Sequence, residues 1–390
     1  MITQSPTPFD HWIRGSFREM NTALETMYYA QEQRHNVEGI GDNIKRALVE
    51  EGRRHIVELL KENNLASGFE NAYDLLGCVG FYMAACRRHE VTEPSREKTS
   101  PLVEASALAL SLGTALGITP RLATSHLADY NFAVNGVYRS FTLLKDEQLF
   151  FDYNALSMFA YMRAADALRR VVHIGISHPL AYHLFCDARA GLQDVGKWSA
   201  LLFDELDVER FFFCVRPYLK PYRVGATVYR GGNAGDFAGT NVVDLLLGLC
   251  NANDLFYSQL LSDKFRFMMP AEQTLMMDCV SRQNFMDQFL LAMATHGHQI
   301  WYKQNLEAFL SVVAAHGQNA TQHHDQLVKK FIEAPAAWLP EEDLTNLTAS
   351  GPPLPVLIKS LEKLRDLRMA RNRQDIPSRY QDVERLRNSL

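Results

Sequence analysis

The feature that most constrains the fold is a helical spacing of apolar residues that recurs along almost the whole 390-residue chain. Between residues 42 and 63, Ile44, Leu48 and Ile56 follow at intervals of four and eight among charged residues, as in an amphipathic helix. Similar patterns occupy residues 73–88, 102–116, 147–173, 188–206, 240–262, 270–295, 302–315 and 321–333. Only residues 222–230 alternate with the period of two that is typical of a strand. The sequence therefore predicts an all-α fold.

The length of the chain allows two or three domains. We expect a small helical N-terminal part over residues 1–145 and a larger helical part over 146–340. A charged helical tail over 341–390 follows, and the turn-forming residues 350–353 lie near its start. Because charges crowd residues 359–387, we expect that stretch to be a solvated helix.

Composition and common motifs exclude several classes of protein. The net charge of −5 gives no basic surface of the kind that binds nucleic acid. The six cysteines are scattered without a CxxC pair, which favours buried thiols over disulfides or a zinc site. Neither a secretory signal nor an apolar stretch of membrane-spanning length is visible. GIGDNI at 39–44 lacks the third glycine of a dinucleotide-binding motif, and no Walker, HExxH or GxSxG motif occurs. We expect a cytoplasmic protein without nucleic-acid or membrane partners.

Residues 211–250 carry the clearest chemical signal. Arg216 follows a run of aromatic residues, and a glycine-rich loop at 231–235 then leads into the apolar segment 242–249. A guanidinium in an apolar setting can hold an anion, and a loop without side chains can approach a flat ligand closely. The alternative is that Arg216, followed by Pro217, caps a helix and pairs with a carboxylate. Phe211, Phe212 and Phe213 cannot all face one pocket, so at least one of them belongs to the core.

His324 lies on the apolar face of the last predicted helix. Leu327, Val328 and Phe331 follow it at three, four and seven residues, whereas His323 falls at the edge of that face. A lone histidine on such a face is either a hydrogen-bonded structural residue or a ligand. In a pocket it can provide one axial bond to haem iron and leave the opposite face open.

Six blocks in the same order make the chain resemble the indoleamine 2,3-dioxygenase superfamily, which includes the monodechloroaminopyrrolnitrin synthases. They include FFFCVRPYL and HDQLVKKFIEAP, and together they span about two-thirds of the chain. VRPYLKPYRVGATVY is closer to the pyrrolnitrin branch, whereas GGNAG with VVDLLLGL is closer to the dioxygenases. The blocks cover residues 75–90, 112–133, 153–170, 211–219, 231–249 and 324–335.

The resemblance implies a helical haem fold and a role for each matching residue. His324 corresponds to the proximal ligand of haem b iron, and Arg216 to the residue that holds the substrate carboxylate. Ser157 corresponds to a position on the distal side of the haem, where it would take part in catalysis together with Arg216. The residues implied in binding substrate are Tyr130 and Asn131 in a pocket helix, Tyr153, Phe211, Arg216, Asn233 and Ala234. Those implied in binding the cofactor are Ser157, Gly232, Asn233, Ala234, His324 and Val328.

Two departures from the family pattern leave the reaction open. Thr321 stands where the family often has an arginine for a haem propionate, and residues 347–353 replace the dioxygenases' glycine- and threonine-rich substrate loop. We expect a haem-dependent oxygenase that acts on tryptophan or a related indole or aromatic amino acid with dioxygen, as a monomer or homodimer. The alternatives are an oxidative rearrangement of a (halo)tryptophan, a haem sensor or carrier without turnover, and a helical protein without cofactor.

Overall fold

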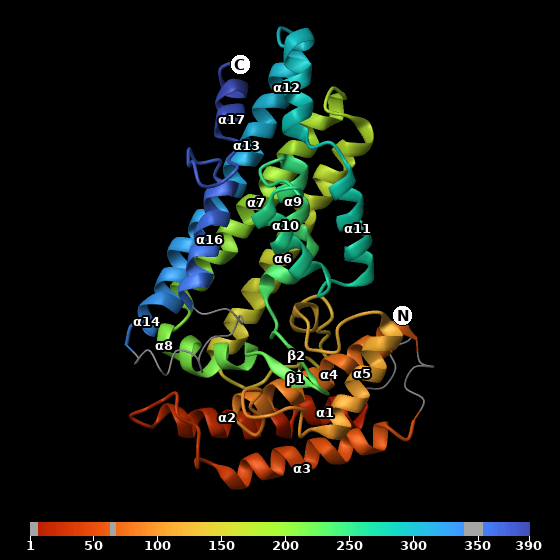
Figure 1. Cartoon of the computed structure of the whole chain (residues 1–390), viewed down its shortest axis with the longest axis vertical. Helices are drawn as coiled ribbons and strands as arrows, with labels where there is room; N and C mark the ends of the chain where they lie inside the picture. The colour runs from red at the N-terminus through yellow and green to blue at the C-terminus, as the bar shows by residue number, and fades with distance from the viewer. Residues whose placement is uncertain (1–6, 63–67, 339–353) are drawn as a thin grey trace. The chain divides into compact units, whose positions relative to one another are not determined.

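The computed structural model describes residues 7–62, 68–338 and 354–390, and its elements are shown in Figure 1. Among the described residues the named elements are helices apart from one two-stranded antiparallel hairpin, which confirms the expected all-α class. No helix in the described ranges is both long and apolar enough to cross a membrane. The loop at 347–353, expected to replace a substrate loop, lies outside the described residues.

The chain divides into two compact units, each assembled from three separate segments. Unit 1 comprises residues 1–152, 206–234 and 331–354, and unit 2 comprises 153–205, 235–330 and 355–390. This division differs from the expected consecutive parts 1–145, 146–340 and 341–390. A sequence read without contacts can be cut only into consecutive pieces, whereas here residues 206–234 return to unit 1 and residues 355–390 join unit 2.

Unit 1 is built around α4, whose side chains are buried on almost every side from Ala72 to Arg88. Gly80 lets the α4 backbone approach Leu122, since a Cβ there would lie 2.8 Å from the Leu122 backbone. The elements of unit 1 are α1 (Pro8–Arg14), α2 (Ser16–Tyr29), α3 (Asp42–Leu59), α4 (Phe69–Arg88), α5 (Val103–Leu116), η2 (Thr124–Leu127), the first turns of α6 (Lys145–Ile174), α8 (Val208–Arg210), η3 (Phe211–Val215), η4 (Arg216–Leu219), β1 (Tyr222–Val224), β2 (Thr227–Tyr229) and α14 (Ala334–Ala336).

The expected extended segment 222–230 is the hairpin of β1 and β2. Tyr222 pairs with Tyr229 and Val224 with Thr227, and Gly225 makes the turn with φ of 57°. A positive φ is accessible to glycine at little cost, so the turn closes without strain.

Unit 2 has one hydrophobic core to which all of its long helices contribute. Within it α7 and α13 pack along one another, and Asn319 of α13 donates to the Leu192 carbonyl of α7 at 2.8 Å (Figure 1). The elements of unit 2 are the remainder of α6, α7 (Pro179–Glu205), η5 (Ala234–Asp236, which begins at the last residue of unit 1), α9 (Ala238–Leu247), α10 (Leu255–Phe265), α11 (Pro270–Ser281), α12 (Phe285–His296), α13 (Ile300–Gln322), η6 (His323–Glu333, whose last residues belong to unit 1), α16 (Leu354–Arg368) and α17 (Tyr380–Arg387).

Two expected helices are each two helices in the structure. The predicted helix 240–262 ends at Gly248, which is left-handed with φ of 79°, and α10 starts again after Asp254, whose carboxylate accepts from the Tyr257 N–H. The predicted helix 270–295 is interrupted before Asn284, which caps α12 in the same way. The helical spacing of apolar residues continues across both breaks, so the sequence pattern did not predict them.

The expectation of a solvated C-terminal helix is wrong. Leu364 and Leu367 of α16 and Leu386 of α17 lie in the core of unit 2. Gly317 of α13 admits the end of α16, because a Cβ there would lie 3.1 Å from the Arg368 carbonyl. The density of charged residues suggested exposure, but Arg365, Asp366 and Arg368 are in buried or partly buried ion pairs.

Candidate functional site

His324 lies in a π-helical continuation of α13, the segment His323–Glu333. The wider turn of a π-helix is rare and is frequently found at functional sites. His324 and Val328 are buried, with exposed fractions of 4% and 1%, whereas His323 is exposed. The predicted faces of the two neighbouring histidines are therefore confirmed, although the predicted α-helix is wound more loosely.

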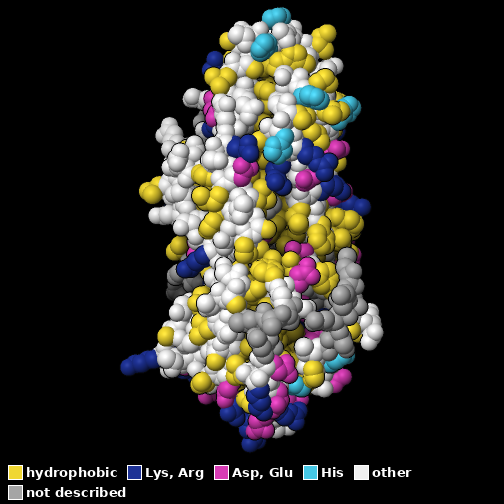
Figure 2. Space-filling model, turned by 90° about the vertical axis from the view of Figure 1, so that its right-hand side faces the viewer, with side chains coloured by type: hydrophobic (Ala, Val, Ile, Leu, Met, Phe, Trp, Pro, Cys, Tyr) yellow, Lys and Arg dark blue, Asp and Glu magenta, His cyan; other side chains and the backbone are white. Residues whose placement is uncertain are grey.

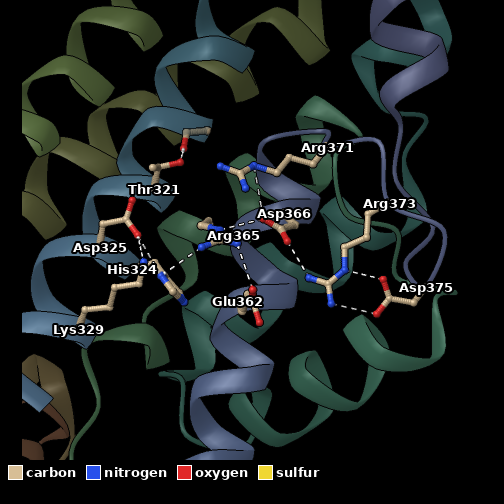
Figure 3. A network of polar contacts seen from close by, with 11 residues as sticks. Thr321, His324, Asp325, Lys329, Glu362, Arg365, Asp366, Arg371, Arg373 and Asp375 are labelled. Atoms are coloured by element: carbon tan, nitrogen blue, oxygen red, sulfur yellow. Dashed lines mark hydrogen bonds and ion pairs between the residues drawn. The ribbon is translucent and has the colours of Figure 1, made fainter. Parts of the chain in front are cut away.

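The two nitrogens of the His324 ring have different surroundings. Nδ1 lies 3.3 Å from Asp325 Oδ1 and 3.2 Å from Arg365 Nη1, which comes from α16 (Figure 3). Nε2 is buried, and no hydrogen-bond partner for it is found among the described residues. A buried polar atom without a partner is costly, so it calls for an explanation. A metal bound at Nε2 would provide one, and a carboxylate at the other nitrogen is the usual companion of a ligating histidine.

A cluster of protein ligands for a free metal ion is not found. In the described ranges no three or more His, Cys, Asp or Glu residues are grouped so as to hold an ion. Figure 2 likewise shows histidine side chains spread over one face rather than gathered at one point. Haem iron needs only one axial residue from the protein, because the porphyrin supplies the other nitrogens. A buried histidine with one ring nitrogen unpaired among the described residues therefore fits the axial position of a haem iron.

Arg216 follows a second π-helical segment, Phe211–Val215, and begins η4 in unit 1. Its side chain is buried, with an exposed fraction of 5%, and its guanidinium carbon lies 5.4 Å from the centre of the Phe212 ring. Burial lowers the pKa of Arg216 to about 10. A buried guanidinium can bind an anion through charge-assisted hydrogen bonds.

The aromatic residues before Arg216 are core residues, as expected for at least one of them. Phe212 and Phe213 belong to a small hydrophobic cluster, and all three phenylalanines are buried. Phe211 packs on Phe150 at a ring distance of 4.8 Å and edge-to-face on Phe331 at 5.9 Å. These contacts fix the position of Phe211 within unit 1.

A buried ion pair that sequence reasoning missed supports this segment. Arg88 forms two hydrogen bonds of 2.8 Å with Glu25, and it also donates to the Phe213 carbonyl at 2.9 Å. Arg88 thus ties α2, α4 and the π-helical segment together just before Arg216. Its place at the end of the apolar helix α4 was the available signal, but the sequence does not reveal its partner.

Tyr130 and Asn131 do not lie in a helix, contrary to the resemblance-based expectation. They follow the short η2 in a turn, where Tyr130 packs edge-on against Tyr73 at 4.8 Å. The Asn131 amide donates to the Arg139 carbonyl at 2.8 Å and accepts from the Arg139 N–H at 3.0 Å. Asn131 therefore holds the backbone of residues 131–139 in place.

The glycine-rich loop packs on its own unit. A Cβ at Gly231 would overlap the Leu219 carbonyl, whereas one at Gly232 would find ordinary contacts of 3.7 Å and beyond. The Thr124 hydroxyl donates to the Asn233 carbonyl at 2.6 Å. Ala234 begins η5. Contact with the Leu219 carbonyl thus explains why residue 231 is a glycine. At Gly232 a Cβ would fit without a clash, so packing does not require a glycine there.

Ser157 and Tyr153 lie on α6 within unit 2, one turn apart. Ser157 is half-buried, and the Tyr153 hydroxyl donates to Glu205 at 2.8 Å. Leu156 and Phe159 on the same helix are exposed, with fractions of 39% and 46%. α6 therefore presents apolar side chains beside Ser157 on a surface of unit 2.

A buried polar cluster around Asp244 in unit 2 was also not predicted from the sequence. Asp244 of α9 accepts from His316 Nε2 at 2.7 Å, from Tyr257 at 2.9 Å, and from two nitrogens of Arg368 at 2.8 and 2.7 Å. Burial alone would raise the pKa of Asp244, but Arg368 and His316 outweigh it and hold the pKa below its usual range. Burial lowers the pKa of His316, whereas Asp244 raises it, and the effect of burial is the larger.

The fold and these residues define an all-α protein with a buried histidine suited to haem iron and a buried arginine suited to an anion. The family model described as monodechloroaminopyrrolnitrin synthase PrnB matches residues 3–390. The chain therefore belongs to this family, which confirms the resemblance drawn from the sequence blocks and makes the protein an oxidoreductase-type enzyme. A comparison with curated proteins gave no match.

Proposed function

We propose that the protein is a haem b-dependent oxygenase that acts on tryptophan or a related indole-bearing amino acid. The observation that carries the proposal is the buried Nε2 of His324, for which the described residues offer no hydrogen-bond partner. The membership of the PrnB family and the π-helical geometry at His324 support it.

His324 would bind the iron through Nε2, with Val328 packed one turn further along the same segment. When bound, the haem would supply the activation of dioxygen, which amino-acid side chains cannot provide. The protein would contribute orientation, exclusion of water and fixed charges. Ser157 is proposed on the distal side, where its hydroxyl can donate a hydrogen bond. Without a basic partner it is a poor general base at neutral pH.

Arg216 would bind the substrate carboxylate through two parallel hydrogen bonds. The hydrogen bond from Arg88 to the Phe213 carbonyl suits this role, because it helps to hold the backbone that carries Arg216. Tyr130, Asn131, Tyr153, Phe211, Gly232, Asn233 and Ala234 remain the proposed surroundings of substrate and cofactor.

A second candidate is an oxidative rearrangement of tryptophan or a halogenated tryptophan on the same residues. The description of the matching family as a synthase supports it. Both candidates use the same axial histidine and carboxylate-binding arginine, so the products separate them.

The test is oxygen consumption and product analysis by mass spectrometry, with protein purified after expression with haem supply. L-Tryptophan and a chlorinated tryptophan serve as substrates, and the His324→Ala variant is the control. A product that has gained two oxygen atoms supports ring opening, and a rearranged product supports the second candidate. If the haem binds carbon monoxide but no indole is turned over, both candidates are contradicted and a role as a haem sensor or carrier is supported.

A further inference from the structure

The Nδ1 atom of His324 faces two groups of opposite character. Asp325 Oδ1, an acceptor, lies at 3.3 Å, and Arg365 Nη1, a donor, lies at 3.2 Å. A neutral imidazole carries one N–H and one lone pair, so Nδ1 either donates to Asp325 or accepts from Arg365. The two hydrogen bonds therefore exclude one another.

The choice at Nδ1 decides what Nε2 can do. When Nδ1 accepts from Arg365, the proton of the neutral ring sits on Nε2, and that nitrogen has no lone pair for a metal. When Nδ1–H donates to Asp325, the lone pair is on Nε2 and can bind iron. Because Nε2 is the buried nitrogen for which the described residues provide no partner, the outcome of this competition controls the proposed ligand atom.

Arg365 and Asp325 also form ion pairs with residues other than His324 (Figure 3). Arg365 donates to Asp366 at 2.8 Å, and Arg373 holds Asp366 from the other side at 2.7 Å. Lys329 donates to Asp325 at 2.9 Å. Arg365 is buried, with an exposed fraction of 8%, so the surrounding protein confines its guanidinium. A confined donor, Arg365, and a more exposed acceptor, Asp325, thus contact the same nitrogen.

We propose that Arg365 is a positioning residue that competes with Asp325 for Nδ1 of His324 and so sets the tautomer and the donor strength of the proposed iron ligand. In the protein without haem, Arg365 holds the ring with its proton on Nε2. Iron bound at Nε2 would require the proton to be on Nδ1, which would then donate to Asp325, while Arg365 would keep its contacts with Asp366 and Glu362. The inference rests on the proposed function only for the identity of the metal, because the competition itself exists without haem.

The consequence in the haem-bound protein follows from the charges. Asp325 draws on the Nδ1 proton and makes the imidazole a stronger donor to iron, whereas the cation of Arg365 opposes this. Removing Arg365 should therefore strengthen the bond to iron and stabilise the ferric state. Replacing Asp325 by a neutral residue should do the opposite, and a supporting residue of this kind typically changes metal affinity by roughly 10–100-fold.

The first measurement uses the whole chain without haem. ¹⁵N shifts of the histidine rings, with His324 assigned by comparison with His324→Gln, report which nitrogen carries the proton. We expect the proton on Nε2 in the wild type and in Arg365→Lys, which keeps a donor, and on Nδ1 in Arg365→Met. Arg373→Met is the matched control, because it removes another ion pair from Asp366, and it should leave the tautomer unchanged.

The second measurement is ferric haem affinity, with the reduction potential and the iron–histidine stretching frequency. We expect tighter binding, a lower potential and a higher frequency in Arg365→Met, and the reverse in Asp325→Asn. A tautomer that is the same in the wild type and in Arg365→Met would overturn the inference. A tautomer that switches in a protein that binds no haem would support the competition and refute the proposed function.

Discussion

Arg368 joins the end of α16 to the core of unit 2, and its removal should be strongly destabilising. Its two hydrogen bonds reach a fully buried carboxylate, Asp244. Truncating one partner of such a pair leaves the other charge buried, at a typical cost of about 3–5 kcal/mol. We therefore expect Arg368→Met to lower the free energy of unfolding of unit 2 by about that amount.

The assay is urea denaturation, with hydrogen exchange on α16 to locate the effect. Arg371→Met is the control, because the Arg371 side chain is about half exposed and Asp366 keeps Arg365 and Arg373 as partners without it, so we expect a cost of about 0–1 kcal/mol. Adding Asp244→Asn to Arg368→Met should recover part of the loss, since the uncompensated charge is then gone. Arg368→Met within about 1 kcal/mol of the wild type, with exchange on α16 unchanged, would refute this reasoning.

The pH dependence of the same pair has a definite sign. The pKa of Asp244 is lower in the folded state than its usual value of 3.8, so the unfolded state binds the proton more readily. The stabilisation by Arg368 is therefore complete above the unfolded pKa and is lost as the pH falls through the folded one. The difference between wild type and Arg368→Met should be constant from about pH 6 to 8 and shrink below about pH 4.

Three further predictions concern the proposed sites. His324→Ala should abolish stable haem binding, measured by absorption spectroscopy. His323→Ala should bind haem almost normally, because the His323 side chain is exposed. If the two variants behave the other way round, the assignment of His324 is contradicted. Arg216→Ala should weaken the binding of L-tryptophan to the haem-loaded protein by roughly 2–5 kcal/mol in calorimetry, and Arg216→Lys should also bind poorly. Unchanged affinity with haem retained would exclude this role. Ser157→Ala should keep substantial turnover, and complete inactivation with haem and substrate still bound would show that its hydroxyl is required.

The spacing of apolar residues predicted most helices, because the apolar face of a helix recurs every three or four residues along the sequence. It predicted α3 and α5 nearly to their ends, and it placed His324 inside and His323 outside. It missed the breaks at Gly248 and before Asn284, since both lie within continuous apolar patterns. The looser winding at His324 was also missed, because the spacing of Leu327, Val328 and Phe331 fits an α-helix.

The partners of buried charges could not be read from the sequence. Arg368 lies 124 residues from Asp244, and Arg365 lies 41 residues from His324. Each is one of many arginines in a charged stretch, and only the folded chain shows which of them enter the core. The same limit explains why residues 359–387 were expected in solvent, and why segments far apart in the sequence are assigned to one unit only when contacts are known.

The central claim, that His324 Nε2 is the single protein ligand of a haem iron, is tested most directly by resonance Raman and absorption spectroscopy of the haem-loaded protein in its ferrous state. We predict an iron–histidine stretching band, loss of that band in His324→Gly, its return on adding free imidazole, and binding of carbon monoxide at the opposite face. A protein that takes up no haem, or a haem with two histidine ligands that does not react with carbon monoxide, would contradict the account.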